Sequence, residues 1–464
     1  MQLIYKPSDK PSISKTIVFA IQQLLAIMAA TLVVPVIIGH GMSSVAALFG
    51  AGVGTLVYLL FTKFKSPVFL GSSFAFIGSM VAAFAGATTV ALGYLGLIMG
   101  AIFAGLVYVA ISIAVKYAGV EWLNKLMPTV VIGPTVAIIG LSLAGNAISD
   151  LQAGDVGIMT QACEHVDPVF QSTANPLIAV LCGLITLAVV VLCSTYGKKM
   201  AKLIPFIIGI LAGYAAALIF TVIGTLADVQ GLILIDFSYF TALWEGGIGI
   251  KTFLALPDFT FITAFGAFGE LSGSYIGTVA VAYIPVAFVV FAEHIADHKN
   301  ISSIIETDLL EDPGLSRTLL GDGVGSMAGA FFGGCPNTTY GESVACVAIT
   351  GNASVITIVF AALGAILISF LAPFVAFVNS IPSCVMGGVC IALYGFIAVS
   401  GLKMIQKVDL GESRNLFVVS TILICGIGGL TLNFGKVTIT SIAVALILGI
   451  LVNIMLGRKT TDKE

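Results

Sequence analysis

Charged residues are scarce in this sequence. Of its 464 residues, 20 are Lys or Arg and 23 are Asp or Glu, which is 9% of the chain; a soluble protein carries about 25%. So few charges cannot cover the surface of a water-soluble globule of this length, and we therefore predict an integral membrane protein embedded in a lipid bilayer. The shortage of basic residues also excludes binding to nucleic acid.

Long intervals of the chain lack Lys, Arg, Asp and Glu altogether. One helix across a bilayer needs about 20 apolar residues, so the charge-free intervals 16–62 and 66–115 each hold two spans, and 343–402 holds most of three. The spans are apolar all round, which predicts an all-α bundle because the strands of a closed barrel would alternate. Fourteen transmembrane spans are predicted, at 17–39, 44–62, 68–86, 94–116, 127–148, 176–196, 203–227, 272–298, 316–333, 339–351, 355–376, 382–404, 415–434 and 437–456.

The basic residues predict the orientation of these spans. Cytoplasmic loops are enriched in Lys and Arg, and with the N-terminus inside, 18 of the 20 basic residues fall in inner segments. Only Lys251 and Lys436 fall outside. We therefore expect a multi-pass protein of the cell (inner) membrane with both termini in the cytoplasm.

Cysteine gives no sign of a disulfide framework. Of eight cysteines, only Cys163 lies in a predicted outer loop, and the others lie at membrane depth. No Cys-x-x-Cys pair is present to suggest a metal site. No metal and no cofactor are expected.

Fourteen spans divide into two repeats of seven, and an odd repeat length places the two halves in opposite orientations. Inverted repeats are typical of secondary transporters, whose binding sites lie where helices are interrupted near the middle of the membrane. The third span opens with SPVFLGSSFAF at 66–76, and its counterpart, the tenth, opens with GGCPNTTYGES at 333–343.

Both openings are rich in Gly, Pro, Ser, Thr and aromatic residues, which favour extended backbone over helix. Each is predicted to be a short extended segment that leads into a half-helix, tolerated at membrane depth only if protein buries it or it lines a cavity. Two half-helix N-termini facing one point would offer free N–H donors to a ligand with carbonyl oxygens. The alternative is two ordinary helices that contain glycine.

Three acids stand out inside the predicted spans: Glu293 and Asp297 in the eighth, and Glu342 in the tenth. Glu293 and Asp297 are four residues apart, so they share a helix face. No Lys or Arg lies in these spans to neutralise them. Ionisable residues at membrane depth mark functional sites, and unpaired carboxyl groups suit a neutral substrate with N–H donors, or a proton, rather than an anion. The alternative is a protonated carboxyl group that only holds the bundle together.

Two further motifs have other interpretations. The segment His294 to His298 reads HIADH, close to the H-x-x-E-H pattern of some zinc proteases, so a membrane metalloenzyme that uses these two histidines is a distant alternative. The segment 323–328 reads GVGSMA and matches a dinucleotide fingerprint, but it lacks the strand context. Glycines at 321, 325, 329 and 333 recur every four residues instead, which predicts a close helix-packing face.

Several segments resemble one transporter family. They are QQLLAIMAATLVVPV (22–36), GSSFAFI (71–77), AEHIADH (292–298), NTTYGES (337–343) and IPSCVMGG (381–388). They are similar to segments of the nucleobase–ascorbate transporter, or nucleobase–cation symporter-2, family, and in particular of its bacterial uracil permease branch. The resemblance extends over essentially the whole chain, and NTTYGE after the ninth span is its most specific part.

The resemblance implies fourteen helices in two inverted repeats, divided between a core and a gate domain. The core would comprise residues 1–126 and 259–378, with spans 1–4 and 8–11, and the gate 127–258 and 379–464, with spans 5–7 and 12–14. It further implies a transporter, not an enzyme, that takes up a nucleobase by proton-coupled alternating access, often as a homodimer. Uracil is the expected substrate, and a purine such as xanthine or urate is the alternative.

The resemblance also assigns roles to single residues. Glu293 and Glu342 match the two carboxylates that bind the base, and Phe74 matches the aromatic residue beside it. Tyr340 and Gly341 match the segment that lines the site.

Some positions depart from the family pattern. Gln22 matches the first-span motif, but Gln23 replaces its histidine, and Asp297 stands where similar uracil permeases carry a histidine linked to proton movement. Of the tenth-span signature, only the first position, Glu342, and the last, Thr350-Gly351, are retained. Asp297, one helical turn from Glu293, is therefore the expected carrier of the coupled proton.

Overall fold

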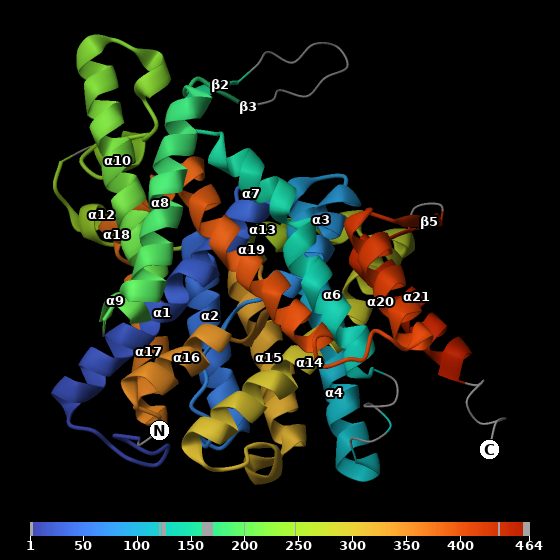
Figure 1. Ribbon diagram of the computed structural model, residues 1–464. Helices are drawn as coiled ribbons and strands as arrows, with labels where there is room; N and C mark the ends of the chain where they lie inside the picture. Colours follow the sequence, from blue (N-terminus) through green and yellow to red (C-terminus); the bar gives the residue numbers. More distant parts are fainter. Residues whose placement is uncertain are drawn as a thin grey trace, which may run out of the picture. The chain divides into compact units, whose positions relative to one another are not determined.

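The structure is a computed structural model that describes residues 3–119, 122, 127–159, 170–198, 200–245, 247–434 and 437–457. Cys163 and Lys436 lie outside these residues. The chain forms two compact units: residues 1–142, 257–367 and 396–464 make unit 1, and residues 143–256 and 368–395 make unit 2 (Figure 1). Helices dominate both units, as predicted; the assignment of a core and a gate domain stays a prediction.

Unit 1 contains the elements from which the candidate site is built. Its first part has α1 (Ile13–Ile38), α2 (Ser44–Phe61), β1 (Leu70–Ser72), η1 (Phe74–Phe76), α3 (Ile77–Ala85), α4 (Val90–Ala118) and α6 (Thr129–Ser142). Its second part has α13 (Thr260–Ala264), η3 (Phe265–Glu270), α14 (Gly273–Ile305), η4 (Leu310–Gly314), α15 (Leu315–Gly333), β4 (Asn337–Thr339), α16 (Gly341–Thr350) and α17 (Val355–Ile368). Its last part has the end of α19 (Ser383–Ile405), then α20 (Ser413–Ile427), β5 (Leu432–Phe434), β6 (Val437–Ile439) and α21 (Ser441–Gly457).

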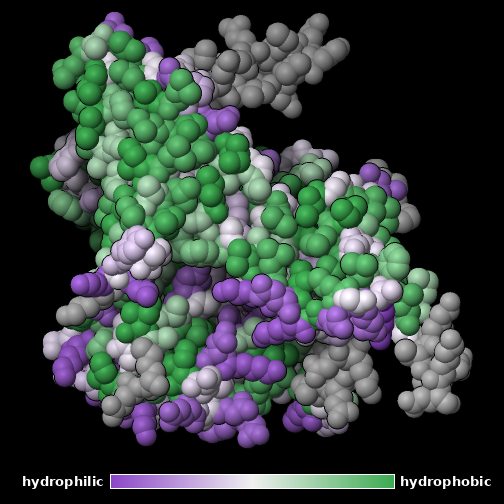
Figure 2. Space-filling view, in the orientation of Figure 1, coloured by the Kyte–Doolittle hydropathy of each residue, from purple (hydrophilic) through white to green (hydrophobic). Residues whose placement is uncertain are grey.

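Unit 2 is built around the helix pair α8 (Pro176–Tyr196) and α10 (Pro205–Ala227), whose surface in Figure 2 is mainly hydrophobic. The other elements of unit 2 are α7 (Ala144–Leu151), β2 (Gly157–Met159), β3 (Phe170–Ser172), α9 (Met200–Leu203), η2 (Gln230–Leu232), α11 (Ser238–Thr241), α12 (Ile250–Phe253), α18 (Ala372–Asn379) and the start of α19. Strands β2 and β3 pair antiparallel as a hairpin.

Each of the fourteen predicted segments contains a helix. In the described part of the chain, eight helices are long and apolar enough to cross a membrane, and five apolar helices are shorter. The chain is thus a helical, multi-pass membrane protein. The count of fourteen spans and the inverted relation of two halves stay predictions.

Some boundaries differ from those predicted. The fifth segment is divided into α6 and α7, and the eleventh ends at Ile368, after which α18 begins with Pro373 in its first turn. Helix α14 continues to Ile305, beyond the predicted end at 298. The extension reads KNISSII, and its Ile301 and Ile305 are buried while Lys299 and Asn300 are exposed.

The two extended segments in the third and tenth spans are confirmed. Strand β1 pairs antiparallel with β4, and Gly71 lies opposite Thr338 in the middle of the three-residue ladder. Further backbone bonds at both ends, from Ser73 N–H to Pro336 O and from Tyr340 N–H to Phe69 O, complete the crossing. Each strand leads into a short helical segment, η1–α3 and α16. The crossing therefore places the starts of two half-helices close together in unit 1.

The glycine-rich helix α15 packs closely on α2, which confirms the predicted packing face. A Cβ atom at Gly325 would lie 2.7 Å from the carbonyl oxygen of Gly54, and one at Gly329 would overlap the side chain of Asn337. Because larger residues do not fit, the small residues allow the two helix backbones to approach.

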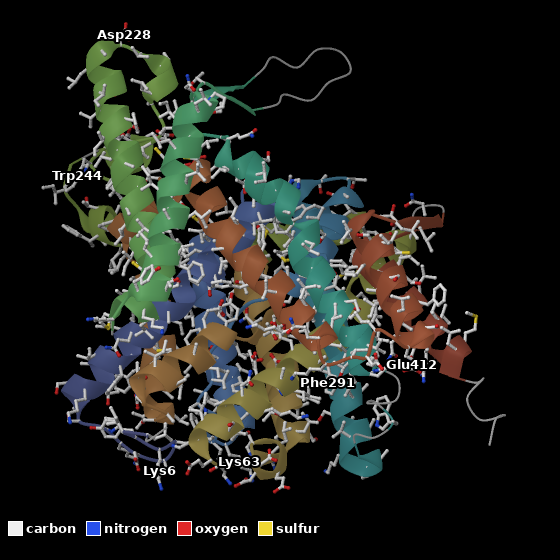
Figure 3. All side chains as sticks on the ribbon, in the orientation of Figure 1. Lys6, Lys63, Asp228, Trp244, Phe291 and Glu412 are labelled. Carbon is white, nitrogen blue, oxygen red and sulfur yellow. The ribbon has the colours of Figure 1, made fainter. Side chains whose placement is uncertain are left out.

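Lysine side chains gather at one end of unit 1. Lys6 and Lys63 lie together at that end in Figure 3, and hydrophilic residues gather there in Figure 2. Phe291, on α14, lies in the interior of unit 1 and is only 2% exposed.

Candidate functional site

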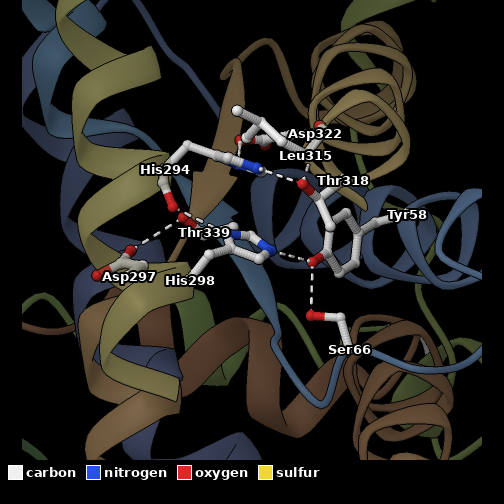
Figure 4. Close-up of polar contacts among 9 residues, drawn as sticks. All are labelled: Tyr58, Ser66, His294, Asp297, His298, Leu315, Thr318, Asp322 and Thr339. Atoms are coloured by element: carbon white, nitrogen blue, oxygen red, sulfur yellow. Dashed lines mark hydrogen bonds and ion pairs between the residues drawn. The ribbon is translucent and has the colours of Figure 1, made fainter. Parts of the chain in front are cut away.

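Helix α14 presents different chemistry on two faces. Glu293 and Asp297, four residues apart, share one face, and His294 and His298 share another. Asp297 is 8% exposed, and its Oδ2 accepts a hydrogen bond from Thr339 Oγ1 at 2.9 Å (Figure 4). This bond connects α14 to the end of β4, so Asp297 lies at the strand crossing.

Helix α16 brings the third acid to the same place. Gly341 begins the helix, and a Cβ atom there would lie 3.9 Å from Oδ1 of Asp297. Glu342, in the first turn, is half-buried, and its carboxyl group accepts a hydrogen bond from its own backbone N–H. The carboxyl group of Glu293 is within electrostatic reach of those of Asp297 and Glu342. Glu293, Asp297 and Glu342 are hereafter called the acid cluster.

Among the described residues, no Lys or Arg forms an ion pair with the acid cluster. Within the described residues the only ion pairs are Lys65–Asp312 and His294–Asp322. Glu293 is exposed at the middle of an apolar helix, and no hydrogen bond joins its carboxyl group to the part of the chain that the structure describes. The oxygens of Glu293 are therefore available to a ligand with N–H donors.

The two predicted aromatic residues have different surroundings. Phe74 is half-buried at the start of η1, beside the crossing. Tyr340 is 3% exposed, and its hydroxyl donates to the carbonyl oxygen of Ser72 at 2.7 Å. Its ring covers Gly71, where any side chain would collide with it. Tyr340 therefore fastens the two strands together, and Phe74 offers the more accessible ring.

Ser343 joins three segments behind the acid cluster. Its Oγ accepts hydrogen bonds from Gln23 Nε2 of α1 and from the backbone N–H of Phe69, at 2.9 Å. Both Gln23 and Ser343 are buried. These bonds fix the position of the neighbouring residue, Glu342, so Gln23 has a defined structural role where the family pattern has histidine.

A fourth acid, Asp322 on α15, was missed by the sequence interpretation. It is fully buried, and its Oδ2 lies 2.7 Å from Nδ1 of His294 (Figure 4). Nε2 of His294 lies 3.0 Å from Thr318 Oγ1, whose single hydrogen goes to the carbonyl oxygen of Leu315. Nε2 must therefore donate, and one further proton lies between Nδ1 and Asp322. The pair is neutral as a whole.

The sequence did contain a sign of Asp322, because it is an acid within the predicted ninth span, which follows the histidine-containing eighth span along the chain. Its partner is 28 residues away in sequence, so spacing did not reveal the pair. Both ring nitrogens of His294 are engaged in hydrogen bonds, so His294 has no nitrogen left to coordinate a metal ion. This argues against the metalloenzyme interpretation. The described residues contain no group of three His, Cys, Asp or Glu side chains that could hold a metal ion.

The site can thus recognise a small planar molecule with both donors and acceptors. The first turns of the half-helices offer backbone N–H groups, because the first four N–H groups of a helix have no partner within it. The acid cluster offers carboxyl oxygens, and Phe74 offers an aromatic surface.

Comparison with known proteins gives a consistent result. The sequence pattern of the Permease family matches residues 14–435. The chain is 36% identical over 459 residues to a uracil permease of Bacillus caldolyticus, covering 98% of this chain and 95% of that protein. It is 35% identical over 445 residues to a uracil permease of Escherichia coli (strain K12), covering 96% of this chain and 91% of that protein.

Two solved structures share the fold at low sequence identity. The transmembrane domain of the cyanobacterium bicarbonate transporter BicA has a TM-score of 0.60 at 13% identity, and the match covers 96% of this chain and 98% of that one. The murine Solute Carrier 26 family member A9 anion transporter, in the inward-facing state, has a TM-score of 0.65 at 11% identity, with coverages of 98% and 70%. These likenesses concern the fold alone.

Proposed function

The chain belongs to the Permease family, and from this membership and the acid cluster we propose that it carries uracil across the membrane together with protons. The observation that carries the proposal is the gathering of Glu293, Asp297 and Glu342 at the crossing of β1 and β4, where no Lys or Arg of the described residues forms an ion pair with them. Such a site repels anions and suits a neutral ligand with N–H groups.

Uracil has the complementary chemistry. Its two N–H groups donate to Glu293 and Glu342, and its two carbonyl oxygens accept from backbone N–H groups at the starts of η1 and α16. Phe74 packs against the ring. A base without a matching donor or acceptor leaves a buried group unpaired, which costs about 1–3 kcal/mol and provides selectivity.

Asp297 is the proposed carrier of the coupled proton, together with Glu293. Both lie on one face of α14, and their carboxyl groups are within electrostatic reach of one another. A proton taken up outside neutralises part of the cluster. The loaded site then crosses the low-dielectric membrane region at a smaller electrostatic cost.

Transport by alternating access follows from the proposed division into domains. Residues 1–126 and 259–378 form the core that holds the base, and 127–258 and 379–464 form the gate. The lysine-bearing end of unit 1 is cytoplasmic in this proposal, in keeping with the positive-inside rule. Both termini then lie in the cytoplasm, the membrane is the inner membrane, and the protein works as a homodimer.

Binding of a panel of bases to the purified protein tests the substrate. We expect unlabelled uracil to displace labelled uracil, and xanthine and urate to fail, because purines place their donors differently. Displacement by a purine at lower concentration than by uracil would instead indicate a purine symporter.

A further inference from the structure

One hydrogen bond connects the acid cluster to the strand crossing. Thr339, the last residue of β4, is fully buried, and its backbone lies opposite Leu70 in the ladder. Its hydroxyl donates to Oδ2 of Asp297 at 2.9 Å (Figure 4). The ladder therefore fixes Thr339, and Thr339 in turn holds the Asp297 carboxyl group.

The two oxygens of the Asp297 carboxyl group have different surroundings. Oδ2 accepts the hydrogen of the Thr339 hydroxyl, whereas no hydrogen bond joins Oδ1 to the described residues. A Cβ atom at Gly341 would lie 3.9 Å from Oδ1 and, apart from its chain neighbours and its own helix backbone, within 4 Å of no other heavy atom of the described residues. Space therefore remains between Oδ1 and the first turn of α16, and Oδ1 is the oxygen that is free to bind a proton.

The strength of the Thr339 bond depends on the charge of Asp297. A hydrogen bond to an ionised carboxylate is roughly twice as strong as one to a neutral acceptor. Thr339 therefore holds the carboxylate more firmly than the protonated acid, and uptake of a proton by Oδ1 loosens the link between α14 and β4. For the same reason, loss of the Thr339 hydroxyl favours the protonated form.

The surroundings of Asp297 offer it no cationic partner. In the part of the chain that the structure describes, the titratable groups beside it on α14 or within electrostatic reach of the acid cluster are Glu293, His294, His298, Tyr58 on α2, Tyr108 on α4, Asp322 on α15 and Glu342 on α16. Helices α3, α6 and α21, which also pack on α14, contain no Lys, Arg, His, Asp or Glu. Among the described residues, Asp297 is thus held by a hydrogen bond and not by an ion pair.

From this geometry we infer that Thr339 is a positioning residue for proton coupling: it holds Oδ2 of Asp297 so that Oδ1 faces the first turn of α16 and takes up the proton. The inference rests on the proposed proton-coupled function. One O–H bond forms at Oδ1 when the proton arrives, and the same bond breaks when the proton leaves, so the step needs no other group to balance. Because the Thr339 bond loosens and tightens with this step, the charge of Asp297 changes the link between α14 and the strand crossing, beside which the base is proposed to bind.

A purely structural role makes a different prediction. The same bond could serve only to fasten β4 to α14, in which case its loss lowers uptake by one factor at every pH. A positioning role instead moves the pH dependence, because a carboxylate that has lost a donor binds a proton at higher pH. The pH midpoint of uptake, rather than the maximal rate, therefore separates the two roles.

The test uses the full-length protein in liposomes with a fixed internal pH. Thr339→Val removes the hydroxyl and keeps the branched shape, Thr339→Ala removes it with a smaller side chain, and Thr339→Ser keeps it. Thr338→Val is the matched control, because Thr338 is a buried threonine of the same strand whose hydroxyl has no hydrogen bond to the described residues. Initial rates of labelled uracil uptake are measured over a series of external pH values, and the melting temperature of each variant reports its folding.

We expect the wild-type rate to fall as the external pH rises. The midpoint of this fall should move up by about one pH unit in Thr339→Val and Thr339→Ala, a roughly tenfold gain in proton affinity. Thr339→Ser and Thr338→Val should keep the wild-type midpoint.

An unchanged midpoint in Thr339→Val and Thr339→Ala, an equal fall in their rates at every pH, or the same shift in Thr338→Val would overturn the inference. If the wild-type rate does not depend on pH, proton coupling itself is wrong and the inference falls with it, and the wild-type measurement alone reveals this.

Discussion

Replacement of Glu293 tests whether its carboxylate binds the base. Because no hydrogen bond joins the Glu293 carboxyl group to the described part of the chain, Glu293→Gln removes no internal hydrogen bond, and it relieves repulsion within the acid cluster. The substitution should therefore not lower the melting temperature. A hydrogen bond to a charged group contributes about 1.5–3 kcal/mol, against about 0.5–1.5 kcal/mol for a neutral one. The amide should therefore weaken uracil binding by about 1–1.5 kcal/mol, or roughly tenfold. Glu293→Ala, which removes the acceptor, should weaken it about 10- to 150-fold.

Calorimetric titration of the purified protein with uracil at one fixed pH measures these changes directly. Glu306→Gln is the matched control, because Glu306 lies exposed at the C-terminal end of the same helix, outside the acid cluster. It should bind uracil as the wild type does. Wild-type affinity in both Glu293 variants would refute the assignment of this carboxylate to the base.

Three further predictions concern other parts of the molecule. Asp297→Asn should bind uracil but lose the dependence of uptake on the pH gradient, measured as labelled uracil uptake with and without the gradient. Gly71→Val should lower the free energy of unfolding by roughly 1–3 kcal/mol or more, because the new side chain meets the Tyr340 ring. The loss is measured as a lower melting temperature and a lower yield of folded protein. Asp155 accepts a hydrogen bond from the Ser383 backbone N–H at 3.1 Å, and burial raises the pKa of its carboxyl group above the ordinary 3.8. The folded protein therefore holds the Asp155 proton more tightly than the unfolded chain does. The stability that this proton contributes is present at acid pH and is lost as the pH rises through the raised pKa. Asp155→Asn should flatten the change in melting temperature with pH.

Each of these predictions has a result that would contradict it. For Asp297→Asn it is undiminished pH-dependent uptake. For Gly71→Val it is wild-type stability, and Gly145→Val, at a position with no atom close to an added Cβ, serves as the control. For Asp155→Asn it is a melting curve that keeps the pH dependence of the wild type.

The positions of the helices were readable from the sequence because lipid imposes a strong constraint. A charge is costly in the bilayer, so most of the predicted spans could be read from intervals with few or no charges, and the ninth, at 316–333, from its glycines. Each of the fourteen predicted segments contains a helix. The extended segments at 66–76 and 333–343 were readable for a local reason. Their Gly, Pro, Ser and Thr residues disfavour helix, and β1 and β4 lie within them.

Contacts between distant segments could not be predicted in the same way. The pairing of Asp322 with His294 depends on how α14 and α15 pack, and nothing in the local sequence specifies it. The surroundings of Tyr340 depend likewise on Gly71, from the other strand of the crossing. From its residue type and position, Tyr340 was expected to line the site beside the base. In the structure its ring instead packs on Gly71, and its hydroxyl bonds the carbonyl oxygen of Ser72.

The most direct test of the account is accumulation of labelled uracil in liposomes that contain only the purified protein. With the outside more acidic than the inside, we predict that uracil accumulates, that protons enter with it, and that a protonophore abolishes the accumulation. Failure of uracil to accumulate, or accumulation that is unaffected by the protonophore, would contradict the account.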